Sequence, residues 1–154
     1  MTSSVADRVQ HRLPRPVKCD CCVSPRVHLQ KRSFMGMRVY SEWDLIWHCL
    51  DCLALVGTHE GTDIPLGYMA DRDTRDARYQ AHKVFDPMWR RRKMSKADAY
   101  IWMASVLGLP LAEAHIGMLD YEQCHRLIAA VNQLQHQRRH PGHWTQKKRK
   151  RRRN

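Results

Sequence analysis

CDCC at residues 19–22 and CLDC at residues 49–52 are the two stretches that decide the fold of this chain. Each contains a C-x2-C pair, and the turn between the two cysteines of such a pair points both thiolates at one ion. Four thiolates form a closed tetrahedral shell without a position for water, so a metal held this way is structural rather than catalytic. We therefore predict one structural Zn²⁺ ion with four ligands: Cys19, Cys22, Cys49 and Cys52.

The other two cysteines need a separate interpretation. Cys21 could replace Cys22 as a ligand, but the second motif repeats the spacing of Cys19 and Cys22, which favours that pair. Cys124 falls on the apolar face of a predicted helix and is interpreted as a core residue. The alternative is a set of unrelated cysteines, which two matched pairs in a reduced compartment disfavour.

The 26 residues between the motifs suit the β-hairpin of a zinc ribbon. Short strands are predicted over 26–32 and 34–40, with Gly36 marking a bulge. Further apolar runs lead into the second motif and follow it, and residues 58–69 (THEGTDIPLGYM) are typical of a loop. A ribbon of about forty residues buries too little apolar surface to fold alone, so metal binding supplies the missing folding free energy.

Helical patterns fill the second half of the chain. We predict helices over 71–85, from 86, from 95 to 107, and from 121 onward, with Asp86 and Ser95 as N-caps and Gly108 as a C-cap. The fold class is α+β: a small N-terminal zinc ribbon of short antiparallel strands, then three or four helices. Because the chain is too short for two independent cores, we expect the helices to stay folded only while docked on the ribbon.

This organisation divides the chain into four segments. Residues 1–18 form a basic N-terminal arm, and residues 19–69 form the zinc ribbon and its loop. Residues 70–137 form the helical segment packed on the ribbon. Residues 138–154 form a basic tail whose composition is typical of disorder.

The net charge of +12 arises from the two ends of the chain. Residues 1–18 carry four basic and one acidic side chain, residues 138–154 carry nine basic and no acidic ones, and residues 19–137 carry 14 of each. Basic arms attract phosphate backbones through counterion release, which predicts nucleic-acid binding without implying sequence specificity. The alternative is a tail that only keeps the protein soluble. The predicted contact residues are Arg138, Arg139, Lys147, Lys148, Arg149, Lys150, Arg151, Arg152 and Arg153.

Membrane insertion and secretion are not expected. No run of 18 or more apolar residues exists, and the N-terminal MTSSVADRVQHRLPRP lacks the apolar core of a signal peptide. We therefore expect a cytoplasmic protein whose thiols stay reduced.

A longer pattern extends from the second cysteine motif. It comprises IWHCLDC at 46–52, VGTH at 56–59, GT at 61–62, PLG at 65–67, AH at 81–82, FDPMW at 85–89 and HIGM at 115–118. In this order the chain resembles the zinc-finger-containing domain family of unknown function found mainly in bacteriophages and prophages. The resemblance covers residues 19–133 and implies the fold, the zinc ion and a phage origin, hence the cytoplasm of a bacterial host. One departure is Val23, which stands where many zinc ribbons have glycine.

Four polar residues within this pattern form a candidate second site. Arg75, Arg78 and His82 are spaced so that one helix face presents all three, and arginine offers a planar fork of donors to a phosphate. His59 precedes them in the loop. The alternative is that these side chains pin the loop at 58–69 onto the helix by hydrogen bonds.

Three further features allow two interpretations each. The tryptophans are either core residues or stacking platforms for bases. The basic cluster at 90–93 is either a favourable charge at a helix C-terminus or part of a phosphate-binding surface. A metal-dependent nuclease needs carboxylates with histidine around a cation; His59, Glu60 and Asp63 are the only local group of this kind, and their spacing matches no catalytic motif.

Two functions that need no enzymatic activity fit these observations better than a metal-dependent nuclease, which stays as the third alternative. The first is a phage-encoded zinc-binding regulatory protein that binds DNA or RNA through its basic arms. The second is a host-takeover factor that binds a host protein, with host RNA polymerase as the leading target and transcription antitermination or inhibition as the result. The neutral body favours the second, because a DNA-binding protein usually has a basic face on its body as well.

Overall fold

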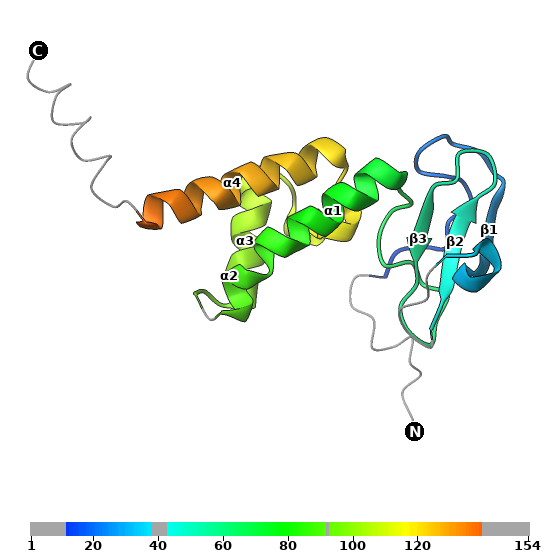
Figure 1. Ribbon diagram of the computed structural model, residues 1–154, viewed down its shortest axis with the longest axis horizontal. Coiled ribbons are helices and arrows are strands. Elements are labelled where there is room, and N and C mark those ends of the chain that lie inside the picture. The colour runs from blue at the N-terminus through cyan, green and yellow to red at the C-terminus, as the bar shows by residue number, and fades with distance from the viewer. Residues whose placement is uncertain (1–11, 38–42, 92, 140–154) are drawn as a thin grey trace, which may run out of the picture.

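The computed structural model describes residues 12–37, 43–91 and 93–139. It confirms the α+β class, because a three-stranded antiparallel sheet precedes a group of helices (Figure 1). The sheet lies at one end of an elongated molecule, and the last helix, α4 (Tyr121–Arg139), ends at the opposite side. Among the described residues, no helix is long and apolar enough to cross a membrane.

The sheet has the order β1-β2-β3, with strands β1 (Val27–Lys31), β2 (Leu45–Cys49) and β3 (Leu55–Gly57). Its register places Val27 opposite Cys49 and Trp47 opposite Val56. Because side chains alternate along a strand, these four share one face, and they pack in one apolar cluster. The outer edge of β3 is extended by isolated bridges to the following loop, Leu55 to Ala70 and Thr58 to Pro65.

The predicted strand over 34–40 is wrong in its described part. Residues Arg32–Met35 form a 3-10 turn, η2, which ends at Gly36 in the left-handed conformation (φ 65°). The Ser33 hydroxyl donates to the Asp44 carboxylate (2.7 Å), and this side-chain bond favours a turn over an extended strand. Gly36 therefore caps a turn rather than marking a bulge, and residues 38–40 lie outside the described residues.

The three longer helices begin at side-chain caps. Helix α1 (Arg72–Phe85) starts at Asp71, whose carboxylate accepts from the Thr74 N–H (2.8 Å). Helix α3 (Lys96–Leu107) starts at Ser95, as predicted, and ends at Gly108 with φ 68°. Helix α4 starts with a reciprocal capping box between Asp120 and Gln123. Two short turns, η3 (Leu111–Glu113) and η4 (Ile116–Met118), connect α3 to α4.

Asp86 does not act as the predicted N-cap of the short helix α2 (Pro87–Arg90). Its backbone is helical, and its N–H still donates to the His82 carbonyl (3.0 Å), so α1 runs on into α2. The Asp86 carboxylate instead lies 3.3 Å from both His82 Nδ1 and Arg90 Nη2. Pro87, which lacks an N–H, marks the break between the two helices.

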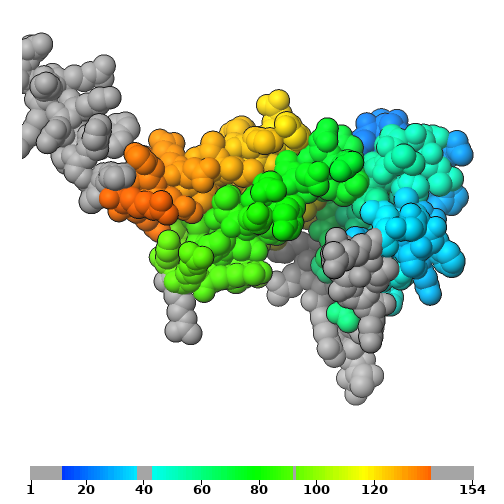
Figure 2. Space-filling model, viewed as in Figure 1, coloured from blue at the N-terminus to red at the C-terminus, as the bar shows by residue number. Residues whose placement is uncertain are grey.

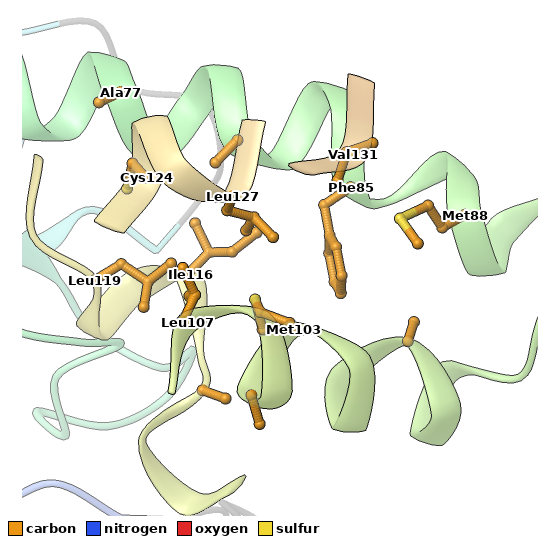
Figure 3. Close-up of a cluster of buried hydrophobic side chains, with 14 residues drawn as sticks. Ala77, Phe85, Met88, Met103, Leu107, Ile116, Leu119, Cys124, Leu127 and Val131 are labelled. Atoms are coloured by element: carbon orange, nitrogen blue, oxygen red, sulfur yellow. The ribbon is translucent and has the colours of Figure 1, made fainter. Parts of the chain in front are cut away.

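The structure contains two apolar clusters, whereas the chain length predicts a single shared core. The smaller cluster lies in the ribbon and includes Cys19, Cys49 and Met69. The larger lies among the helices around Phe85, Met103 and other side chains of α1, α3 and α4 (Figure 3). The short linking turns allow α1, α3 and α4 to enclose a core of their own. With two clusters in place of one, we replace the expectation that the helices stay folded only while docked on the ribbon by the prediction that they stay folded without it.

Ribbon and helices meet at a seam where two backbones touch. The Tyr68 N–H donates to the Gly117 carbonyl (3.0 Å). A Cβ atom added to Gly67 would lie 2.0 Å from that carbonyl oxygen, and one added to Gly117 would lie 2.9 Å from the Leu66 oxygen. The PLG and HIGM stretches of the sequence thus need glycine because they pack backbone against backbone.

Candidate metal centre

Two turns of the ribbon bring the predicted ligands together. Cys19 and Cys22 lie in the turn before β1, Cys49 ends β2, and Cys52 lies in the turn before β3. The four sulfur atoms lie within 4.8 Å of one another, with Cys19 and Cys52 3.5 Å apart and Cys22 and Cys49 3.6 Å apart. A tetrahedron with Zn–S bonds of about 2.3 Å has sulfur atoms about 3.8 Å apart. The donor set therefore fits one Zn²⁺ ion in a closed tetrathiolate shell.

The two cysteine turns have the same backbone geometry. In the first, the Val23 N–H donates to the Cys19 carbonyl (3.0 Å), and in the second the Leu53 N–H donates to the Cys49 carbonyl (3.1 Å). Val23 and Leu53 both adopt a left-handed conformation, with φ of 62° and 63°. Such a conformation costs a non-glycine residue about 1–3 kcal/mol, which the surrounding structure has to offset. The first turn therefore keeps its geometry although Val23 stands where many zinc ribbons have glycine, and Leu53 occupies the equivalent position in the second turn.

The four ligands do not share one electrostatic environment, because backbone donors favour the thiolate form of Cys49 whereas burial raises the pKa of Cys52 to about 12. Hydrogen bonds from the backbone of Cys52, and then of Asp51, lower the pKa of Cys49 to about 7, although burial acts to raise it. The Cys21 N–H donates to the Cys19 sulfur (3.3 Å). Since zinc binds the thiolate and not the thiol, the backbone donors at Cys49 favour metal binding, while the Cys52 thiol has to lose its proton as the metal binds.

The neighbours of the ligands lie outside the cluster. The Cys21 thiol points at the Met69 carbonyl (3.6 Å), so the choice of Cys22 over Cys21 agrees with the structure. His48 faces the other side of β2 from Cys49, and its Nδ1 lies 2.9 Å from the Gln30 amide nitrogen. Cys124 is fully buried in the helical core, where burial raises the pKa of its thiol to about 11.

The four residues of the second candidate site divide into two groups. Arg75 donates to the Ala70 carbonyl (2.8 Å), and Arg78 donates to the carbonyls of Tyr68 and Leu119 (both 2.8 Å). These bonds hold the end of the loop at 58–69 on α1. The two arginines thus follow the alternative in which the side chains pin the loop onto the helix by hydrogen bonds. Burial lowers the pKa of both arginines.

The two histidines make other contacts. His82 lies beside the Asp86 carboxylate, 3.3 Å from Nδ1 to oxygen. His59 lies in the loop after β3, where its carbonyl accepts from the Thr62 hydroxyl (2.9 Å) and burial lowers the pKa of its imidazole.

The geometry offers no second metal centre in the described part of the chain. There, the four cysteines are the only group of three or more potential ligand residues whose donor atoms lie together. The Asp63 carboxylate, which a nuclease centre with His59 and Glu60 would need, forms an ion pair with Arg15.

The tryptophans contribute to packing. The indole N–H of Trp43 donates to the Thr58 hydroxyl and that of Trp47 to the Asp63 carbonyl, both at 2.8 Å. Trp89 and Trp102 are half-buried against the helical core. All four therefore have a structural role.

Two acidic residues of the cysteine motifs have supporting roles that the motif pattern does not reveal. The Asp20 carboxylate accepts from the Met69 N–H (2.7 Å), and Asp51 forms an ion pair with Arg26 (2.7 Å). A carboxylate beside thiolates is repelled unless it has a donor of its own. The sequence feature that could have predicted these contacts is the acidic residue inside each cysteine motif, since its carboxylate needs a hydrogen-bond donor nearby.

Comparison with known proteins agrees with this centre. A family model described as a zinc-finger-containing domain matches residues 15–134. No curated protein and no solved structure gives a match. The matched residues include both cysteine pairs, the seam and the helical core.

Proposed function

The chain belongs to this family of zinc-finger-containing domains, and from that premise we propose that it is a phage-encoded regulatory protein that binds nucleic acid in the cytoplasm of a bacterial host. Its zinc ion is structural, since a closed tetrathiolate shell offers no position for a substrate. The ion fixes the ribbon, and the basic arms supply the affinity.

The distribution of charge carries this proposal. Residues 138–154 contain nine basic side chains and no acidic one. The first two, Arg138 and Arg139, are exposed on the last turn of α4, at the end of the molecule farthest from the sheet. A polyanion that meets this end of the protein releases its condensed counterions to lysine and arginine, whatever its base sequence.

The test compares the full-length chain with a variant in which the seven basic residues at 147–153 are replaced by glutamine. A matched control places lysine at all seven positions, which keeps the charge. Binding to a fluorescent duplex DNA, a single-stranded DNA and a single-stranded RNA is titrated at three salt concentrations.

We expect the glutamine variant to bind all three probes more weakly and with a lower salt dependence. With about six phosphates contacted, the slope of log K against log salt on duplex DNA falls by roughly five units, whereas the lysine control keeps its slope. An unchanged slope in the glutamine variant would overturn the proposal and point to a protein partner such as host RNA polymerase.

A further inference from the structure

The folded body is neutral in total but not in distribution. Residues 83–96 carry six basic side chains and one acidic, a net charge of +5. The rest of residues 19–137 carries eight basic and 13 acidic side chains, a net charge of −5. The neutral total charge of the body was an argument for a protein partner. This uneven distribution weakens that argument, because a nucleic-acid-binding protein usually has a basic region on its body as well.

The described residues that carry this charge lie at one end of the helical segment, which we call the basic pole. It includes the end of α1, α2, the turn that follows, and the start of α3, and its described cations are exposed. In that part of the chain, only Arg90 among them forms an ion pair, with Asp86. The residues of the basic pole are Lys83, Arg90, Arg91, Lys93 and Lys96.

The basic pole and the start of the tail lie at the same end of the molecule. Both are far from the sheet along the long axis, and the helix ends that carry them are exposed in the space-filling view (Figures 1 and 2). Arg138 and Arg139 therefore continue the positive charge from the folded body toward the tail.

Aromatic rings hold three of these cations in place. The Lys96 ammonium lies 5.0 Å from the centre of the Trp89 ring and 5.9 Å from that of Tyr100, and the Arg90 guanidinium lies 5.3 Å from the Trp89 ring. Lys83 lies 5.6 Å from the ring of Tyr79. Because Trp89 and Tyr100 also pack on the helical core, Arg90 and Lys96 are fixed to a rigid support.

Helix stability explains only part of this arrangement. Lys83 and Arg90 lie at the C-terminal ends of α1 and α2, where the helix dipole favours a cation. Lys96 is the first residue of α3, where the dipole disfavours a cation, and Lys93 precedes the helix altogether. The helix dipole therefore does not account for the two lysines, and their exposed charge is complementary to an anion.

We propose that the basic pole is a folded binding site for the phosphodiester backbone of nucleic acid, at the same end of the molecule as Arg138 and Arg139 and able to bind without the rest of the tail. The inference rests on the proposed function, since it extends nucleic-acid binding from the tail onto the body. A strand that lies across the pole contacts Arg91, Lys93 and Lys96 and continues toward Arg138 and Arg139.

The test reverses two charges of the pole in the full-length chain. Arg91→Glu and Lys93→Glu are combined, because both side chains are exposed and neither forms an ion pair in the described structure. The matched control combines Lys31→Glu and Arg72→Glu, which make the same change in net charge on exposed side chains nearer the sheet. Both pairs are made in the natural chain and in the variant with glutamine at 147–153, and circular dichroism and zinc content verify their folding.

The pole variant is expected to bind all three probes roughly tenfold to a hundredfold more weakly than the control pair, with a slope on duplex DNA lower by about 1.8. The glutamine-tail chain should retain salt-dependent binding that the pole variant abolishes. Equal binding by pole and control variants would overturn this site while tail-dependent binding upholds the proposed function. Absence of binding by the natural chain would overturn both.

Discussion

The ribbon buries five side chains in its cluster, two of them zinc ligands, whereas the helical segment buries fourteen around Phe85 and Met103. A cluster as small as the first cannot stabilise a fold by apolar burial alone, so metal binding supplies the folding free energy of the ribbon. The helical cluster contains no zinc ligand and relies on packing. The difference shows that one short chain combines two units that are stabilised by different interactions.

The seam joins these two units without merging their clusters. It consists of the contact between Gly67 and Gly117 and of the bonds from Arg78 to Tyr68 and Leu119. A hollow of about 250 Å³ lies beside it, lined in part by Asp20, Arg78 and Asp120. Because Asp20 and Arg78 already bond to backbone groups, we interpret the hollow as part of the joint.

Removal of the zinc should have the largest effect, and it should unfold the ribbon while the helices stay folded. Cys49→Ser, or a chelator, forfeits metal-binding free energy on the order of 10 kcal/mol, so the ribbon unfolds while most helical circular dichroism remains. The matched control is Cys124→Ser, which should keep zinc and lower the stability of the helices by about 1–3 kcal/mol. Complete loss of helix on chelation would contradict the separation and support a single cooperative core.

Widening the seam should have a smaller effect. Gly67→Ala places a methyl group in the space of the Gly117 carbonyl, which we expect to destabilise the protein by about 1–3 kcal/mol through forced separation of the backbones. Zinc content should not change, because no ligand moves. Gly57→Ala is the control, since its Cβ would meet only the ends of two side chains, Leu66 at 3.3 Å and Arg32 at 3.9 Å. Equal thermal stability of the two variants would show that the seam does not join the units.

The smallest expected effect concerns the cap of α1. Hydrogen bonds from the backbone and then the side chain of Thr74 lower the pKa of the Asp71 carboxyl. Its folded-state pKa is below its unfolded-state value, so the stabilisation is present above the unfolded-state pKa and is lost as pH falls through the folded-state pKa. Asp71→Ala should cost about 1 kcal/mol near neutral pH and less in acid.

Asp71→Asn is the matched variant for that prediction. It keeps a side-chain oxygen for the cap but cannot titrate, so its cap should stabilise the helix alike at both pH values. Urea denaturation of the three proteins near neutral pH and in acid measures the difference. A cost of Asp71→Ala that does not change with pH would contradict a role for the charged cap.

Local signals in the sequence predicted much of this structure. The metal ligands follow from the repeated spacing of Cys19–Cys22 and Cys49–Cys52, because each pair is closed by a turn of its own. The start of α3 follows from Ser95, whose cap lies within one helical turn. The turn at Arg32–Met35 was missed because its stabilising contact, from Ser33 to Asp44, joins residues 11 apart.

Long-range features could not be predicted in the same way. Arg78 reaches Leu119, 41 residues away, and the pairing of Gly67 with Gly117 becomes visible only once the ribbon and the helices are in place. The basic cluster at 90–93 is visible in the sequence, but its place in the molecule is not. Only the positions of α2 and α3 show that this charge lies at the same end of the molecule as the end of α4.

Metal analysis of the purified full-length protein and two single variants tests the central claim most directly. Under reducing, chelator-free conditions we expect one zinc per chain in the natural protein and in Cys21→Ser, because the Cys21 thiol points away from the cluster. Cys22→Ser should lose the zinc, since it removes one of the four thiolates. A natural protein without zinc, or a Cys21→Ser variant that loses zinc while Cys22→Ser keeps it, would contradict the account.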